Sequence, residues 1–124
     1  MTMSFDGERP IFIQLAKQLE DAILAGIYAE EQQIPSITEY SVAYKINPAT
    51  ALKGINILVD EGLLYKKRGL GMFVADGARQ ALIRRRQESF FTERIVPLVQ
   101  EAKNLGMTMP ELDKMIERGY ENVD

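Results

Sequence analysis

The sequence predicts a mainly α-helical protein that contains one small β-hairpin. Three observations support this prediction. Apolar residues recur at helical spacing in several segments, and three of these segments begin with a typical capping sequence. Two short runs of β-compatible residues flank a glycine-containing turn near the middle of the chain. Hydrophobic residues make up 46% of the chain and charged residues 27%, which is the composition of a folded globular protein.

The first helix is predicted at 11–25. Leu15, Leu19 and Ile23 recur at intervals of four residues, so they lie on one face of a helix and form an apolar stripe. Gly26 follows them, and glycine is a residue that commonly ends helices. We therefore expect an amphipathic helix whose stripe packs on the core.

Two capped helices follow in close succession. Ser36 and Glu39 are spaced as a capping box, in which each side chain accepts a hydrogen bond from a backbone N–H that the helix leaves free. This box predicts a second helix that runs to about Tyr44. Asn47 is a favourable N-cap, and Pro48 suits the first helical position because the N–H that it lacks would have no partner there. A third helix is therefore predicted to begin after a turn of about three residues.

A β-hairpin is predicted after Gly62, which ends the third helix. The runs 63–67 and 72–75 are rich in β-compatible residues, and the glycines of the intervening segment 68–71 permit the positive φ of a tight reversal. The predicted order of elements is that of a winged helix-turn-helix: a helix, a capped helix, a short turn, a second capped helix and a two-stranded wing. In this fold the third helix fits the major groove of DNA, and the wing reaches the neighbouring backbone or minor groove.

A helical hairpin is predicted beyond the wing. The segment 77–104 has a helical apolar pattern, but Pro97 lies inside it and predicts a kink or break near 94–96. The sequence Thr108–Glu111 has the spacing of another capping box. It predicts a last helix that runs to about Arg118.

The length of 124 residues suits one compact domain with a helical appendage better than two domains that each have a core. We divide the chain into a winged helix-turn-helix DNA-binding domain at 1–76 and a helical dimerisation module at 77–124. The module has more apolar side chains than two isolated helices can bury against each other, which predicts a dimer interface. The alternative is that these side chains pack back on the first helix. The predicted interface residues are Phe90, Phe91, Ile95, Leu98, Val99, Leu112, Met115 and Ile116.

Charge is unevenly distributed along the chain. The formal net charge of −3 argues against a polyanionic partner. Residues 40–86, however, contain nine basic side chains and three acidic ones, a local balance of +6. The flanking segments 1–39 and 87–124 have balances of −5 and −4. Since a polyanion responds to the local field, the basic middle segment predicts double-stranded DNA as a partner.

The composition excludes several classes of protein. The chain contains no cysteine and no histidine, which removes disulfide frameworks, thiolate zinc sites, cysteine nucleophiles and imidazole catalysis. We therefore expect no enzyme, no cofactor and no metal. No apolar run is long enough to span a membrane, and residues 1–10 lack the basic-then-apolar pattern of a secretory signal. A cytoplasmic protein without a membrane partner is expected, and the sequence assigns no small-molecule effector.

The residues themselves resemble a known family. The stretch 34–74, IPSITEYSVAYKINPATALKGINILVDEGLLYKKRGLGMFV, closely resembles the N-terminal domain of GntR-family regulators, and the P-I-x-x-Q-L opening of 10–27 resembles the family's first helix. The short remainder, with 93–116 as its clearest part, is similar to the YtrA-type branch, in which a helical hairpin serves chiefly to dimerise. The resemblance implies a sequence-specific transcriptional regulator, a repressor, that acts as a homodimer on a pseudo-palindromic operator. An alternative remains open: a winged-helix protein-interaction module with weak or lost DNA specificity.

The resemblance also assigns DNA contacts, residue by residue. Ser36 would contact a phosphate, Asn47 would lie at the start of the recognition helix, and Arg68 would enter the minor groove from the wing tip. Thr38 and Leu52 stand where the family commonly has arginine, so we expect a different operator, read in part through thymine methyl contacts. The predicted DNA-binding residues are Ser36, Thr38, Lys45, Asn47, Ala49, Thr50, Leu52, Lys53, Lys67, Arg68, Gly69 and Gly71.

Several of these assignments have a structural alternative. Ser36 and Asn47 are helix caps whether or not they contact DNA. The sequence Arg68–Gly71 is also typical of a simple hairpin turn. The arginine run 84–86 is typical of a solvated helix face, and it could also contact flanking phosphates.

Overall fold

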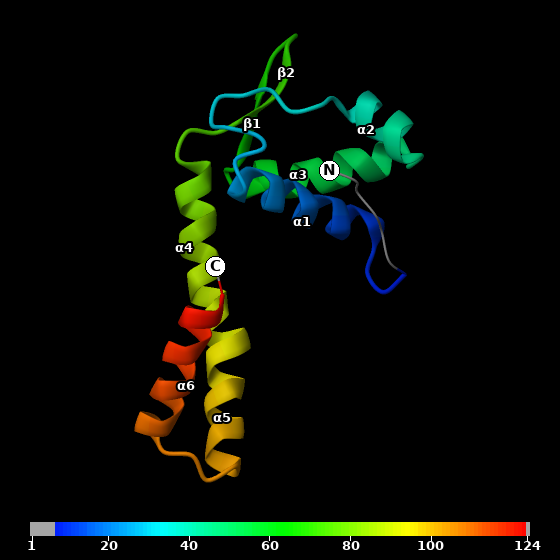
Figure 1. The fold of residues 1–124 in the computed structure, drawn as a ribbon. Helices are drawn as coiled ribbons and strands as arrows, with labels where there is room; N and C mark the ends of the chain where they lie inside the picture. The colour runs from blue at the N-terminus through cyan, green and yellow to red at the C-terminus, as the bar shows by residue number, and fades with distance from the viewer. Residues whose placement is uncertain (1–6, 124) are drawn as a thin grey trace. The chain divides into compact units, whose positions relative to one another are not determined.

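The computed structural model describes residues 7–123 and confirms the predicted succession of elements (Figure 1). Residues 1–6, which belong to the N-terminal stretch without the pattern of a secretory signal, and residue 124 lie outside the described residues. The chain forms two compact units that divide between Arg84 and Arg85. This division lies inside a helix, and the functional boundary after residue 76 stays a prediction.

Three helices and a hairpin build the first unit. The helices are α1 (Ile11–Leu24), α2 (Ile37–Tyr44) and α3 (Pro48–Asp60), with bounds close to those predicted. Helices α1 and α3 lie side by side (Figure 1). The core takes buried side chains from these helices, from the segment between α1 and α2, from the wing with the residue before it, and from the start of the next helix: Leu15, Ala16, Leu19, Ile23, Ile34, Tyr40, Ala51, Ile55, Leu58, Leu63, Leu64, Val74, Ala78 and Leu82.

The predicted hairpin is present as strands β1 (Leu64–Lys67) and β2 (Gly71–Val74), which pair antiparallel. Lys67 lies opposite Gly71, so the turn consists of the three residues between them. Gly69 in this turn has φ +79°, a left-handed conformation that favours glycine. The sequence therefore identified the wing and its turn chemistry correctly.

Gly54 allows α1 and α3 to pack closely. An added Cβ at this position would lie 2.8 Å from the Phe12 carbonyl oxygen and 3.1 Å from the Leu15 side chain. Replacement of Gly54 by alanine is therefore expected to destabilise the protein by about 1–3 kcal/mol, because the two helices must separate. The better helix propensity of alanine offsets only about 1 kcal/mol, so overpacking decides the sign.

Urea unfolding followed by circular dichroism measures this effect. The matched control is Gly119→Ala, where the added Cβ has no atom of the described structure within 4 Å. This helical position is expected to be neutral or to gain up to about 1 kcal/mol from the same substitution. Equal stability of Gly54→Ala and the parent protein would show that the helices do not pack as closely as described.

A π-helical turn interrupts the long helix that follows the wing. Helix α4 (Ala78–Phe90) continues into the π turn η1 (Phe91–Ile95) and then into α5 (Val96–Asn104). The N–H of Val96 donates to the Phe91 carbonyl, which is the wide spacing of a π turn. Pro97, which cannot donate and crowds the preceding turn, lies directly after it. The predicted irregularity is thus present, beginning a few residues before the predicted site.

The last helix, α6 (Met109–Asn122), begins at the predicted capping box and extends beyond the predicted end. The Thr108 hydroxyl accepts from the Glu111 N–H, and the Glu111 carboxylate accepts from the Thr108 N–H at 3.0 Å. These hydrogen bonds from Thr108 hold the pKa of the Glu111 carboxyl below its usual value. Helix α6 runs back alongside α5 (Figure 1), which gives the predicted helical hairpin.

Candidate nucleic-acid interface

Local hydrogen bonds fix the turn between α2 and α3. The capping box of α2 is complete: the Glu39 N–H donates to Ser36 Oγ at 3.0 Å, and the Ser36 N–H donates to Glu39 Oε1 at 3.1 Å. At the start of α3, Asn47 Oδ1 accepts from the Ala49 N–H at 2.8 Å. Within the turn, Ser41 Oγ donates to the Ile46 carbonyl at 2.7 Å. The helix-turn-helix is therefore held by its own short-range polar contacts.

Helix α3 divides its residues between the core and solvent. Ala51, Ile55 and Leu58 are fully buried on one side. The candidate contact residues lie on the other side: Thr50 is half-buried, and those that are exposed are Asn47, Ala49, Leu52 and Lys53. The first turn of α3 thus presents a polar cap, a small side chain and an apolar side chain to solvent, a mixture that suits the edges of bases.

Lys53 has an intramolecular partner that sequence patterns did not indicate. Its Nζ lies 4.2 Å from the centroid of the Phe12 ring on α1, within the range of a cation–π interaction. The side chain remains exposed. This contact gives the Lys53 ammonium group a preferred position beside the start of α1.

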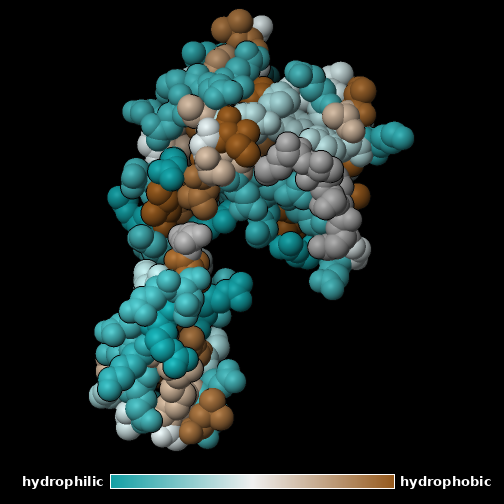
Figure 2. Space-filling model, in the orientation of Figure 1, coloured by the Kyte–Doolittle hydropathy of each residue, from teal (hydrophilic) through white to brown (hydrophobic). Residues whose placement is uncertain are grey.

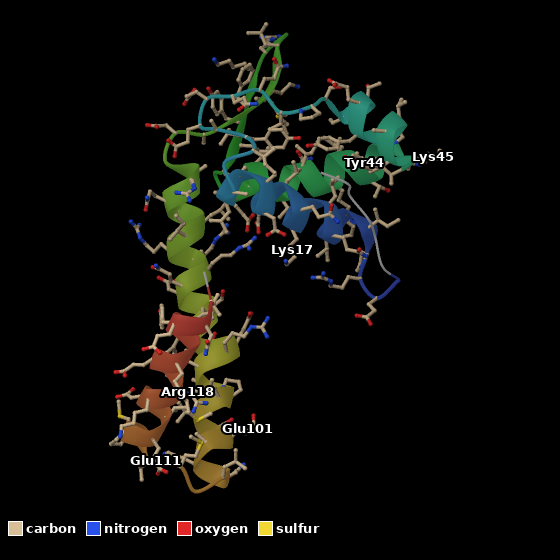
Figure 3. The ribbon with its side chains drawn as sticks, viewed as in Figure 1. Lys17, Tyr44, Lys45, Glu101, Glu111 and Arg118 are labelled. Atoms are coloured by element: carbon tan, nitrogen blue, oxygen red, sulfur yellow. The ribbon has the colours of Figure 1, made fainter. Side chains whose placement is uncertain are left out.

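The candidate residues on α2 and in the following turn are also accessible. Ser36 and Thr38 are exposed at the start of the helix, and Lys45 is exposed at its end (Figure 3). Lys45 has φ +54°, a left-handed conformation that ends α2. Burial raises the pKa of Tyr40 above its usual value, with Tyr28 adding to the shift, so this core tyrosine stays neutral beneath the turn.

The wing tip carries the predicted charged and glycine residues. Lys67, Arg68 and Gly69 are exposed, and Gly71 is half-buried. Lys67 Nζ lies 4.4 Å from the centroid of the Phe73 ring on the facing strand. Leu70 is also exposed at the tip, although the sequence analysis did not include it among the candidate contacts.

A third segment, residues 31–34, accompanies the wing and was not among the predicted elements. Glu31 and Ile34 donate their N–H groups to the Val74 and Met72 carbonyls at 2.8 and 3.0 Å, and the Val74 N–H donates to the Gln32 carbonyl at 3.0 Å. The Tyr65 hydroxyl on β1 donates to Glu31, which raises the pKa of this tyrosine. Figure 1 shows the segment between α1 and α2 beside the hairpin. The one sequence signal is Pro35, because the residue before a proline favours an extended backbone.

The arginine run 84–86 extends across the division between the two units. Arg84 and Arg85 are exposed, whereas Arg86 is half-buried. The solvated-face interpretation and the phosphate-contact interpretation are both compatible with these exposures. The role of this run stays a prediction.

The second unit buries very little of itself. Between Arg85 and Val123, Ala102 alone among the described side chains is buried. All eight predicted interface residues are at least partly accessible: Ile95 and Leu112 are half-buried, and those that are exposed are Phe90, Phe91, Leu98, Val99, Met115 and Ile116. Figure 2 shows tan and brown surface among teal side chains on this unit. Such a patch is unusual for a surface that stays in water.

Residues 7–123 provide neither a carboxylate metal site nor a membrane-spanning helix. Within this range the acidic side chains form no cluster of three or more that could hold a metal ion. Of the helices described here, none combines the length and the apolar character required to cross a bilayer.

Known proteins are similar to this chain in sequence and in fold. The family model of bacterial regulatory proteins, gntR family, matches residues 13–74. The HTH-type transcriptional repressor YtrA of Bacillus subtilis (strain 168) is 26% identical over 107 residues, which cover 86% of this chain and 82% of YtrA.

Solved structures agree with this match. A crystal structure of a transcriptional regulator of the GntR family from Bacteroides thetaiotaomicron is 36% identical, with a TM-score of 0.75, and the match covers 90% of this chain and 96% of that one. The crystal structure of AraR(DBD) in complex with operator ORX1 is 30% identical, with a TM-score of 0.56, over 60% of this chain and 96% of that chain.

Proposed function

Because this chain belongs to the gntR family of bacterial regulatory proteins, we propose that it is a repressor that binds a pseudo-palindromic operator as a homodimer. Membership makes the chain a DNA-binding transcriptional regulator. Accessible apolar residues of the second unit support dimerisation and with it operator symmetry, and the likeness to the repressor YtrA supports repression.

The observation that carries the proposal is the accessible first turn of α3. Asn47 caps this turn, so the backbone is fixed while Ala49 and Leu52 remain exposed. A helix that is rigid at its N-terminal end and bare of bulky charged groups there can enter the major groove closely. In this proposal Ala49 and Leu52 contact base edges, and Thr50 contacts a phosphate.

Positive charge around this helix supplies the sequence-independent part of binding. Lys45 precedes α3, and Lys67 and Arg68 lie at the wing tip; all three side chains are exposed. We assign Lys45 and Lys67 to backbone phosphates and Arg68 to the minor groove. The related AraR domain is bound to an operator in its crystal structure, which supports operator DNA as the partner of the matching domain here.

Dimerisation is supported by the accessible apolar residues of the second unit. Phe90 and Phe91 are 55% and 58% exposed, and they precede an apolar stripe along α5 and α6. A second copy of the chain would bury these side chains, and a two-fold interface would present two α3 helices to DNA. Two equivalent recognition helices predict two half-sites of inverted sequence about one helical turn apart.

Selection of bound duplexes from a random DNA pool tests this function. We expect an enriched inverted repeat with one fixed spacing, and an affinity that falls steeply as the salt concentration rises. The competing function is a winged-helix module for protein partners, which the net charge of −3 favours. Enrichment of no sequence, together with weak and salt-insensitive binding, would support that module and contradict the repressor.

Leu52 is expected to determine part of the operator sequence. A leucine side chain contacts a thymine methyl group, whereas arginine donates two hydrogen bonds to guanine. The Leu52→Arg variant is therefore expected to select guanine at one position of each half-site, with a discrimination of about 1–3 kcal/mol against the parent base. The same random-pool selection measures the change, and an unchanged preference would remove Leu52 from the base-contacting set.

A further inference from the structure

Part of the segment before α2, residues 31–34, is attached to the wing. Residues 31–34 pair with β2 through backbone hydrogen bonds, and Gln33 forms an antiparallel bridge with Phe73. Ile34, at the end of this segment, is 2% exposed and belongs to the core. The chain thus passes from the edge of the wing directly into the hydrophobic interior.

Gln33 also makes a side-chain contact with the wing tip. Its Nε2 donates to the Leu70 carbonyl oxygen at 2.5 Å, and Leu70 lies in the turn between the two strands. The turn has one backbone hydrogen bond of its own, from the Leu70 N–H to the Lys67 carbonyl at 2.9 Å. The Gln33 amide therefore adds a second restraint on the same short loop.

Gly71 provides the space that this contact requires. A Cβ at Gly71 would lie 2.7 Å from Gln33 Nε2, closer than non-bonded atoms approach. Gly71 also has φ +123°, a conformation that other residues rarely adopt. The absence of a side chain at this position is thus explained inside the protein, without a DNA strand that approaches the backbone.

The same short segment begins the helix-turn-helix. Gln33 is followed by the buried Ile34, and Ser36, the N-cap of α2, comes two residues later. A restraint at Gln33 therefore connects the tip of the wing with the start of α2. The wing tip and the start of α2 are therefore linked through the short stretch from Gln33 to Ser36 as well as through the hairpin.

We propose that Gln33 is a positioning residue that holds the wing tip in the conformation that contacts DNA. The inference rests on the proposed function, since it concerns how the wing of a DNA-binding domain is oriented. In this proposal Gln33 acts through Arg68 and Gly69, which contact the DNA. Gly71, which has no side chain, leaves the space that the Gln33 amide occupies.

A double-mutant cycle tests this proposal. Gln33→Leu removes the donor and keeps much of the side-chain volume, and it is expected to weaken operator binding about fivefold, the usual worth of one net hydrogen bond. In the Arg68→Ala background the same substitution is expected to weaken binding less than about twofold, because the tip no longer makes its main contact. Equal effects in both backgrounds would overturn the proposal, because Gln33 would then act independently of the wing tip.

Gln32→Leu is the matched control. The Gln32 side chain accepts from the Ala29 N–H at 2.9 Å, and Ala29 lies outside the wing. This variant is expected to bind the operator as the parent protein does, within about twofold. A loss equal to that of Gln33→Leu would assign the effect to the whole segment and contradict a specific role of the Gln33 amide.

Amide hydrogen exchange of the free protein separates this inference from the proposed function. Gln33→Leu is expected to accelerate exchange of the Leu70 N–H severalfold, whereas Gln32→Leu leaves it unchanged. Unchanged exchange in Gln33→Leu would overturn the inference, even if the protein binds its operator well. Faster exchange in a protein that binds no duplex would instead contradict the proposed function. The hydrogen bond from Gln33 to Leu70 would then stabilise the fold without serving DNA binding.

Discussion

Replacement of Ala49 by glutamate is expected to lower operator affinity at least about 100-fold, because a carboxylate in the major groove meets like charge and costs several kcal/mol. The same substitution is expected to leave the fold intact or slightly more stable. Ala49 is exposed in the first turn of α3, where an acidic side chain interacts favourably with the helix dipole, by about 0.3–1 kcal/mol. Binding and stability should thus change in opposite directions.

Fluorescence anisotropy with the selected duplex measures the affinity, and thermal unfolding measures the stability. Ala81→Glu is the matched control, because Ala81 is also an exposed helical alanine, on α4. It is expected to change operator affinity less than about threefold, since Ala81 is not among the predicted DNA-binding residues and salt screens an exposed charge that makes no contact with the DNA. Retained affinity in Ala49→Glu would exclude α3 as the recognition helix.

Replacement of Phe91 by glutamate is expected to convert the proposed dimer into a monomer and to lower operator affinity about 100-fold or more. Phe91 is exposed in the π turn at the start of the apolar stripe, so a charge there would have to be buried between the two copies. A monomer binds one half-site and loses the gain from linking two binding events, which is a factor of about 10² to 10⁴.

Sedimentation velocity and anisotropy together check this prediction. Gln100→Glu adds the same charge to an exposed polar position on α5 and removes no apolar group. This control is expected to remain dimeric and to bind as the parent protein does. If Phe91→Glu were also dimeric, the interface would have to lie elsewhere, and the apolar residues of α5 and α6 would need another explanation.

Most of the fold could be predicted because its boundaries are encoded locally. The caps Ser36, Asn47 and Thr108 each use a side chain within three residues of the N–H that they satisfy, so a short stretch of sequence predicts each helix start. The wing was equally predictable, because the φ of Gly69 is required by the turn itself.

Features that depend on distant residues could not be predicted in this way. The segment 31–34 is polar up to the buried Ile34 and has no alternating pattern, and it lies beside the wing only because β2 offers it hydrogen-bond partners. The π turn at 91–95 lies on the N-terminal side of Pro97, where proline crowds the helix and leaves a carbonyl without its donor, but nothing local decides that the irregularity is a π turn or that it begins at Phe91.

The candidate interface likewise contains residues that local sequence indicates and contacts that only the tertiary structure shows. Ser36, Asn47 and Arg68 were identifiable from capping and turn chemistry together with family resemblance, and all three are accessible. The contact of Lys53 with the Phe12 ring and that of Gln33 with Leu70 join residues about 40 positions apart. Only the tertiary structure brings these pairs together.

Two copies of the chain are proposed to bind one duplex through α3 and the basic wing tip. The mass of the complex tests this stoichiometry most directly. Sedimentation equilibrium of the protein with its selected operator, at two salt concentrations, gives the stoichiometry and the electrostatic contribution together. We expect two chains per duplex and an affinity that falls steeply with salt, as several released counterions require. A protein that remains monomeric and binds no duplex at low salt would contradict the account.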